Sequence, residues 1–373
     1  MADSVSAGPH PERTSVLTPE VLADPVALTR ALVDIESVSG DEKEIADAVE
    51  TALRHLPHLS VERLGNTVAA RTDLGRSSRV VLAGHLDTVP IAGNFPSRAS
   101  VTEDGVELMW GCGTSDMKSG TALALHLAAT VAEPKFDVTY FFYEAEEVES
   151  ERNGLYLVSQ SRPELLAADF AILLEPTHGE VEAGCQGTLR AIVTTRGKRA
   201  HSARSWLGSN AIHAAGEILQ RLSAYRAREV EIDGCLYREG LNAVSISGGI
   251  AGNVIPDHCE IEVNYRFAPS RSVAEALDHL VELFQGFEVK VTDAAPGAMP
   301  GLSLAPAAQF IEATGATPRA KLGWTDVSRF AGLGIPALNF GPGDPNLAHK
   351  PEEHVEVAKI VEGAAVLRSW LAS

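Results

Sequence analysis

The sequence predicts an α/β protein in which a mixed, mostly parallel sheet is flanked by helices and carries an inserted α+β domain. Short, very apolar segments such as residues 80–84 are separated by amphipathic stretches, which is typical of buried parallel strands alternating with helices. Residues 187–297 instead show the order β-α-β-β-α-β, a ferredoxin-like pattern. A chain of 373 residues also exceeds one ordinary hydrophobic core, so we expect two domains.

Charge and cysteine content narrow the possible partners and the compartment. The net charge of -19 argues against nucleic acid and against anionic membranes, because both require a basic surface. The cysteines are widely separated and form no Cys-x-x-Cys pair, which suits a reducing compartment. Residues 1–15 predict a disordered tail without the apolar core of a signal peptide, and no apolar run reaches membrane-spanning length. We therefore expect a cytoplasmic protein.

The first domain is expected to be discontinuous, comprising residues 16–186 and 298–373. Its first clear helix starts at Asp24, where an aspartate cap precedes a proline in the first turn. The apolar runs and turn residues that follow predict strands at 59–64, 67–71, 80–84, 138–143, 170–174 and 337–340, and helices from 41, at 117–131 and from 355 onward.

The inserted domain is predicted by a change of pattern near residue 187. The strand at 259–267 alternates apolar and polar residues, so one of its faces should be wet. Ser272 and Glu275 form the capping box of a helix. The remaining elements expected here are strands at 188–195, 242–247 and 287–291 and a helix from 209.

Histidines and carboxylates follow several of the apolar segments of the first domain. Ligands of open α/β sheets bind just beyond the carboxyl ends of the strands. Two ordinary roles are alternatives to ligand binding. Asp116 is well placed to cap the next helix, and acidic clusters usually lie in solvated loops. A run of glutamates directly after a buried strand favours a cation instead, because crowded carboxylates repel one another. The residues that converge on this edge are His85, Asp87, Asp116, Glu146, Glu147, Glu175 and His349.

These residues lie within motifs that resemble the dinuclear zinc aminoacylase and carboxypeptidase family, which includes deacylases of amino-acid biosynthesis. The resemblance extends from about residue 24 to the C-terminus, and the first two motifs in this order are its most specific part. It implies a zinc-peptidase-like fold whose inserted domain serves as a lid and forms a homodimer. The motifs are GHLDTVP at 84–90, GCGTSDMK at 111–118, EE at 146–147, LEPT at 174–177, AHS at 200–202, NYRF at 264–267 and AHKP at 348–351.

The resemblance implies a site for two zinc ions, with cobalt as an alternative at one position. His85 and Glu175 would bind one ion. Glu147 and His349 would bind the other, and Asp116 would bridge the two ions. A glutamate at position 175 resembles the deacylase and carboxypeptidase branch of the family.

The resemblance also assigns catalytic roles. Asp87 would orient His85 by fixing its tautomer. Glu146 would be the general base, since a proton must move from the attacking water to the leaving amine. His201, in the inserted domain, would cross a dimer interface and stabilise the oxyanion. The alternative is that His201 is an ordinary surface histidine without a catalytic role.

Three further residues would contact the substrate. Arg266, on the wet face of its strand, suits a substrate carboxylate. Asn253 and Thr325 lie in segments that resemble substrate-binding loops of the family. Three positions depart from the pattern: Ser205 replaces a proline, Glu352 replaces an asparagine, and Cys185-Gln186 replaces a basic pair linked to acyl-group recognition.

The expected activity is hydrolysis of an amide bond in a small acylated amino acid. The resemblance implies N-succinyl-LL-2,6-diaminopimelate as substrate and succinate and LL-2,6-diaminopimelate as products, within synthesis of lysine and of cell-wall precursors. The residues at 185–186 differ from the basic pair linked to acyl-group recognition. Deacetylation of acetylornithine is therefore an alternative, as is another acylamino-acid hydrolase or carboxypeptidase activity. A non-catalytic binding protein is a further alternative, although such a protein would be expected to have lost ligands or the base.

Overall fold

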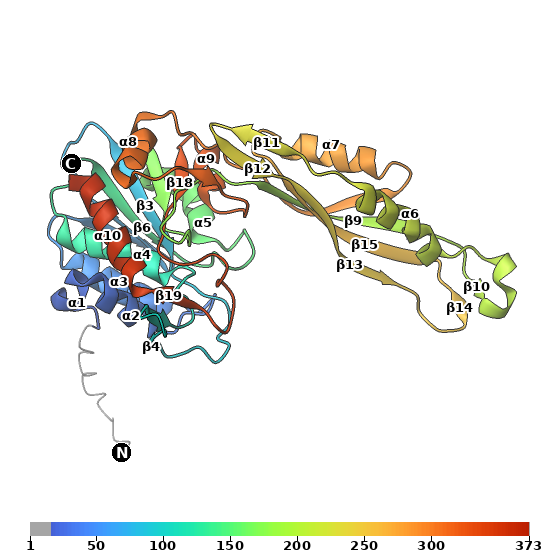
Figure 1. Ribbon diagram of the computed structural model, residues 1–373, viewed down its shortest axis with the longest axis horizontal. Coiled ribbons are helices and arrows are strands. Elements are labelled where there is room, and N and C mark those ends of the chain that lie inside the picture. Colours follow the sequence, from blue (N-terminus) through green and yellow to red (C-terminus); the bar gives the residue numbers. More distant parts are fainter. Residues whose placement is uncertain (1–15, 373) are drawn as a thin grey trace, which may run out of the picture.

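A mixed sheet of eight strands forms the centre of the larger body in the computed structural model, which describes residues 16–372 (Figure 1). The strand order is β1-β2-β6-β3-β7-β18-β8-β17. The central strands β6, β3, β7 and β18 run parallel, and β1, β2 and β8 join antiparallel. The strands are β1 (Ser60–Leu64), β2 (Thr67–Arg71), β3 (Arg79–His85), β6 (Asp137–Tyr143), β7 (Phe170–Leu173), β8 (Glu182–Ala183), β17 (Arg319–Ala320) and β18 (Ala337–Asn339). The tail predicted at 1–15 lies outside the described residues.

Helices cover both faces of this sheet, which explains why its central strands are apolar throughout. Val80 and Leu82 of β3 belong to one buried cluster, whereas Val81 and Ala83 belong to the cluster on the opposite face. The helices of the first face are α1 (Pro19–Ala23), α2 (Pro25–Val33), α3 (Lys43–Arg54), α4 (Lys118–Thr130), α8 (Ala305–Thr314) and α10 (Val357–Ala372). The opposite face carries α5 (Gly154–Ser161), the 3-10 helix η1 (Pro163–Leu165) and α9 (Val327–Gly332).

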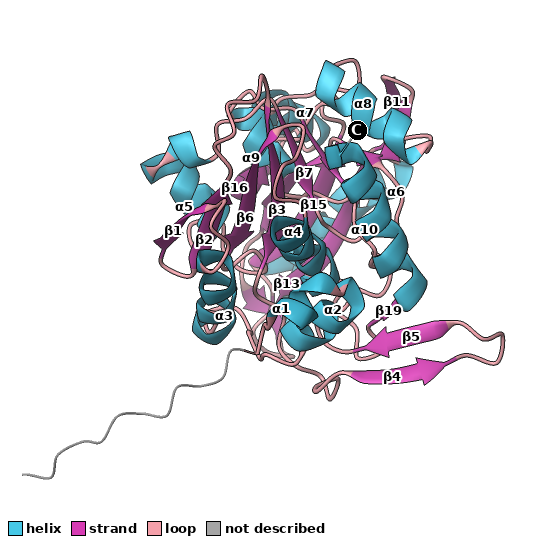
Figure 2. Cartoon of the chain, turned by 90° about the vertical axis from the view of Figure 1, so that its left-hand side faces the viewer, coloured by secondary structure: helices cyan, strands magenta, loops and turns pink. Residues whose placement is uncertain are grey.

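A small antiparallel sheet was not predicted. It has the order β19-β5-β4, with β4 (Arg98–Val101), β5 (Glu107–Trp110) and β19 (His354–Glu356). The β4–β5 hairpin projects from the larger body (Figure 2). Because β5 pairs with a strand that lies far along the chain, neither strand has a strong local signal. For the same reason the last helix begins at Val357, after β19, and not at 355.

The inserted segment contains the predicted β-α-β-β-α-β order. Its antiparallel sheet has the order β13-β15-β9-β16, and α6 and α7 pack on one face of it. The predicted capping box at Ser272 and Glu275 is present. The elements are β9 (Gly187–Arg196), α6 (Ala211–Ala224), β13 (Gly240–Gly248), β15 (His258–Phe267), α7 (Val273–Leu283) and β16 (Glu288–Ala295). The structure adds a hairpin of β11 (Glu229–Ile232) and β12 (Cys235–Arg238), and a tip made of β10 (Ala200–His201), η2 (Ser202–Leu207) and β14 (Val254–Ile255).

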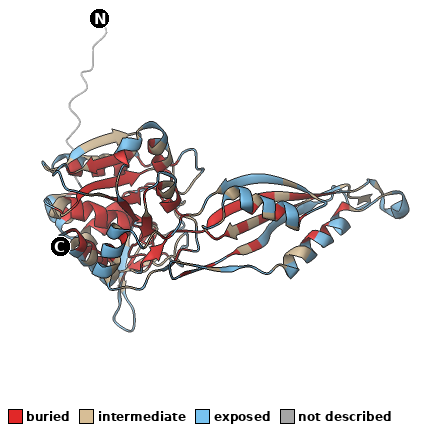
Figure 3. Ribbon diagram, turned by 90° about the horizontal axis from the view of Figure 1, so that it is seen from above, coloured by how far each residue is buried: buried red, intermediate tan, exposed pale blue. Residues whose placement is uncertain are grey.

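The inserted segment extends away from the larger body as a thin arm (Figures 1 and 3). The chain enters and leaves the arm side by side, because Cys185 and Ala298 exchange two main-chain hydrogen bonds of 3.0 Å. In the arm, burial is concentrated between the sheet and its two helices, and β13 is largely exposed (Figure 3). None of the described helices has the length and apolar character needed to cross a membrane.

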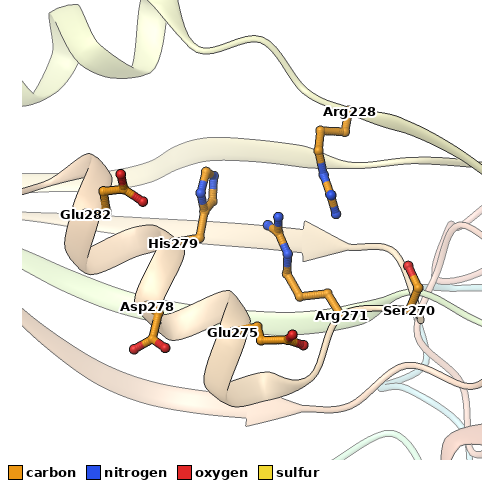
Figure 4. Close-up of a pocket in the computed structure, with 7 residues that line it drawn as sticks. All are labelled: Arg228, Ser270, Arg271, Glu275, Asp278, His279 and Glu282. Atoms are coloured by element: carbon orange, nitrogen blue, oxygen red, sulfur yellow. The ribbon is translucent and has the colours of Figure 1, made fainter.

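A cavity of about 370 Å³ lies beside α7 in the arm (Figure 4). Its arginines already have protein partners: Arg228 donates to both oxygens of the buried Glu239 at 2.7 and 3.0 Å, and Arg271 donates to Tyr265. Because these arginines are already paired and several lining residues are exposed, we interpret this cavity as a polar surface depression of the arm. Its lining residues are Arg228, Ser270, Arg271, Glu275, Asp278, His279 and Glu282.

Candidate metal centre

The strand order brings four of the predicted site residues together. β6, β3 and β7 are parallel neighbours, so they end at the same edge of the sheet. His85 is the last residue of β3, Glu146 and Glu147 follow β6, and Glu175 follows β7. This edge is where ligands of open α/β sheets bind.

Asp116 lies between two histidines from distant parts of the chain. Its Oδ1 is 3.2 Å from Nε2 of His85, and its Oδ2 is 3.3 Å from Nε2 of His349. The same His349 nitrogen is 2.9 Å from Oε1 of Glu147. The alternative that Asp116 caps the next helix is wrong, because the cap position of α4 is Met117, which makes no side-chain capping bond within the described chain.

Three groups of side chains in residues 16–372 could each hold a cation, because their ligand atoms lie within 4.8 Å of one another. Two of the groups share Asp116. Oδ1 of Asp116 faces His85 of one group, Oδ2 faces His349 of the other, and neither group includes Glu146. The groups are His85, Asp116 and Glu175; Asp116, Glu147 and His349; and His85, Glu146 and Glu147.

Asp87 connects His85 to the loop after β6. The main-chain carbonyl of Asp87 accepts a hydrogen bond from Nδ1 of His85 at 3.0 Å, so Nε2 is the nitrogen that faces Oδ1 of Asp116, at 3.2 Å. The two carboxylate oxygens of Asp87 accept the main-chain N–H groups of Glu146 at 3.0 Å and Glu147 at 3.1 Å. Burial opposes ionisation of Asp87, but its contacts with His85 lower its pKa to about 2.

The site carries crowded negative charge. Burial and the charge of Asp116 raise the pKa of Glu175 to about 8, and burial and the charge of Glu175 raise the pKa of Glu146 well above its usual value. Hydrogen bonds to Asp116 and Glu147 raise the pKa of His349 to about 10. Oε1 of Glu175 is buried without a hydrogen-bond partner in the described chain. Cations among these groups would relieve both the repulsion and the unpaired oxygen.

The donor set fits divalent zinc or cobalt. Imidazole nitrogen and carboxylate oxygen are the usual ligands of catalytic zinc sites, and catalytic sites keep a position open for water or substrate. Side chains of the two Asp116 groups range from fully buried His85 to His349, whose side chain is 53% exposed. The site is therefore buried at His85 and reached by solvent at His349.

Two buried carboxylates beside this site were missed in the sequence. Glu353 accepts main-chain N–H groups of the loop that carries Asp116. Asp326 accepts a hydrogen bond from Nδ2 of Asn153 at 2.8 Å, and after burial and Glu175 its charge further raises the pKa of Glu146. Their position in the sequence offered little signal, because an acid in a loop is usually solvated.

The four remaining predicted residues are not all near this site. Thr325 is buried in the larger body, where its hydroxyl donates to Oδ1 of Asn339 at 2.9 Å. Arg266 is half-buried on the polar face of β15. His201 ends β10 and Asn253 immediately precedes β14, and both side chains are exposed. Figure 1 shows β10 and β14 at the tip of the arm, far from β3.

Comparison with known proteins places this chain in a family. Residues 81–373 match the sequence model of the family described as peptidase family M20/M25/M40. The chain belongs to this family. The family predicted from the motifs is thereby confirmed, and so is the α/β fold with a mainly parallel central sheet.

Relatives of the M20 chain include two desuccinylases. The chain is 57% identical over 355 residues to a Mycobacterium tuberculosis protein with the provisional name succinyl-diaminopimelate desuccinylase, covering 94% of this chain and 99% of the relative. It is 53% identical over 363 residues to the Corynebacterium glutamicum succinyl-diaminopimelate desuccinylase, with coverages of 94% and 97%. A tripeptidase from Staphylococcus aureus shares the fold with a TM-score of 0.76 at 21% identity, covering 95% of this chain and 98% of its own.

Proposed function

We propose that this M20 chain hydrolyses the amide bond of N-succinyl-LL-2,6-diaminopimelate to succinate and LL-2,6-diaminopimelate. The observation that carries the proposal is a pair of ligand groups joined at Asp116, with the unused carboxylate of Glu146 beside them. The near full-length identity of 57% and 53% to the two desuccinylases supports the choice of substrate. The reaction belongs to the synthesis of lysine and of cell-wall precursors.

Five side chains would hold two zinc ions, with cobalt as an alternative at one position. When bound, two such cations supply a water molecule of lowered pKa and polarise the amide carbonyl. The positive charge also offsets the carboxylates of Asp116, Glu147 and Glu175, which makes their burial less costly. The ligands are His85, Asp116 and Glu175 for one ion and Asp116, Glu147 and His349 for the other.

Glu146 is assigned the proton transfers. Its main-chain N–H is held by Asp87, so the residue has a defined position next to the ligands. Burial and neighbouring charge raise its pKa, which favours holding a proton between its removal from water and its delivery to the leaving amine nitrogen. Loss of such a base costs on the order of 10²–10⁴ in rate.

We further propose a homodimer formed through the arm. His201 and Asn253 are adjacent at the arm tip, where the main-chain N–H of Ser202 donates to the Asn253 carbonyl. Because the tip lies away from the site of its own chain, these two residues would act in the site of a partner copy, with His201 donating to the oxyanion (Figure 1). Apolar side chains exposed along β13 and the tip support a second copy: Trp206 at 77%, Val244 at 58%, Ile246 at 53% and Ile250 at 66%.

Arg266 and Thr325 complete the proposed substrate contacts. A guanidinium on the polar face of β15 suits a carboxylate of the substrate. Thr325 would contribute from the larger body. The chain would act in the cytoplasm, a proposal supported by its four cysteines, which are all free and buried in the described structure.

The deciding experiment measures turnover of purified, zinc-loaded protein on N-succinyl-LL-2,6-diaminopimelate and on acetylornithine. We expect activity on the succinyl compound and loss of about 10²–10⁴ of it in Glu146→Gln. Glu149→Gln, which changes an exposed residue of the same acidic run, is the matched control and should keep wild-type activity.

Two outcomes would contradict the proposal. Brisk hydrolysis of acetylornithine without hydrolysis of the succinyl compound would assign the chain to the deacetylase alternative. A purified protein that takes up neither zinc nor cobalt, measured by elemental analysis after dialysis, would favour a non-catalytic binding role.

A further inference from the structure

Glu353 is a buried carboxylate that holds the loop carrying Asp116. Its Oε1 accepts the main-chain N–H groups of Ser115 at 2.8 Å and Asp116 at 3.0 Å, and its Oε2 accepts that of Gly113 at 3.0 Å. The residue is 1% exposed, so water does not replace these contacts. Burial raises the pKa of Glu353 to about 7, and the three main-chain hydrogen bonds oppose that rise because they favour the ionised carboxylate.

The same residue joins this loop to the segment that follows His349. The main-chain carbonyl of Glu353 accepts the N–H of Gly111 at 3.2 Å, and the next carbonyl, that of His354, accepts the hydroxyl of Ser115 at 2.9 Å. The N–H of Glu353 donates to the carbonyl of Lys350 at 3.1 Å, which closes the turn just after His349. Glu353 therefore fixes Asp116 and His349 relative to each other.

Asp87 provides a precedent within this molecule. Each of the two buried carboxylates accepts main-chain N–H groups from a loop that carries site residues: Asp87 from Glu146 and Glu147, and Glu353 from the Asp116 loop. These three contacts of the Glu353 carboxylate are made with main-chain N–H groups, so Glu353 positions Asp116 through the backbone.

We propose that Glu353 is a positioning residue that sets the place of the Asp116 carboxylate between the two cation sites. The inference rests on the proposed dinuclear function of those sites. Asp116 is the ligand that both sites share, so a small displacement of its main chain changes both sites together. Partners of this kind typically affect metal affinity by 10–100-fold.

Two variants differ in how many acceptor contacts of the carboxylate they remove. In Glu353→Gln one oxygen becomes an NH₂ group, so either the Gly113 N–H or the Ser115 and Asp116 N–H groups face a donor. Glu353→Ala removes all three acceptor contacts. Glu352→Gln is the matched control, because the neighbouring Glu352 is exposed.

The affinity of each folded protein for zinc is measured by competition with a chromophoric chelator, and cobalt absorption spectra report the geometry of the loaded sites. We expect affinity to fall by about 10–100-fold in Glu353→Gln and further in Glu353→Ala, with an altered cobalt spectrum. The kcat should fall more than KM rises. Glu352→Gln should match the wild type.

Thermal unfolding of the metal-free proteins tests whether the effect is only structural. A lower midpoint with unchanged zinc affinity and cobalt spectrum would overturn the positioning role while leaving the proposed function intact. A wild type that binds no divalent cation would overturn both the proposed function and this role.

Discussion

Asp87→Asn tests whether one buried carboxylate organises the base and a ligand together. Asp87 uses both oxygens: Oδ1 accepts the N–H of Glu146 at 3.0 Å, and Oδ2 accepts the N–H of Glu147 at 3.1 Å and the hydroxyl of Ser39 at 2.7 Å. An asparagine has one acceptor oxygen in place of two. Whichever way the amide turns, an NH₂ group faces one of these main-chain N–H groups.

The size of the effect follows from the lost hydrogen bond. Loss of a buried hydrogen bond to a charged group costs about 1.5–3 kcal/mol, which corresponds to about 10–150-fold if it appears wholly in the barrier. The main chain of Glu146 and Glu147 should shift, so the proton acceptor and a ligand move together. We expect kcat to fall within this range, and zinc affinity to weaken, because Oδ1 of Asp87 also lies 3.4 Å from Nδ1 of His85.

Steady-state release of succinate, zinc competition and thermal unfolding measure these effects. Asp41→Asn, at an exposed position in the neighbouring loop, is the control and should behave as wild type. Wild-type kcat together with wild-type zinc affinity in folded Asp87→Asn would refute the reasoning, because the contacts would then hold nothing in place.

Four further substitutions test the fold and the assembly. Gly120→Ala should destabilise the protein by about 1–3 kcal/mol in urea unfolding, because the added Cβ would lie 2.0 Å from the carbonyl oxygen of Leu174. Gly216→Ala is the matched control within a helix. Its Cβ would meet no described atom within 4 Å, so it should instead stabilise the protein by about 0.5–1 kcal/mol. Glu239→Gln should cost about 1.5–3 kcal/mol at pH 7. Burial raises the pKa of Glu239, but its hydrogen bonds bring it below the usual value. In titrations the loss should therefore begin to shrink below about pH 4.3, the usual glutamate value, and disappear as the pH falls through the lower pKa of the folded protein. Ile246→Asp on exposed β13 should yield monomers in light scattering and lower activity; an active monomer would contradict the proposed dimer.

Local sequence pattern was sufficient for the elements that carry the site. The apolar run ending in His85 and the run before Glu146 read as buried strands because both faces of each strand are covered by helices. The family followed from motifs at strand ends, and the capping box at Ser272 marked a helix start, because such signals involve residues a few positions apart. Elements that depend on distant partners, such as β5 and β19, left no comparable pattern.

The amino-acid sequence alone thus predicted an α/β fold, a ferredoxin-like insertion and a set of candidate metal ligands. Tertiary structure decided which atoms meet: Asp116 lies between His85 and His349, and Glu353 holds the Asp116 loop from a position more than 200 residues away. The reason is physical. Periodic burial and turn chemistry act over a few residues and leave a repeating pattern, whereas a single hydrogen bond between distant segments needs only one suitable side chain and leaves no pattern at all.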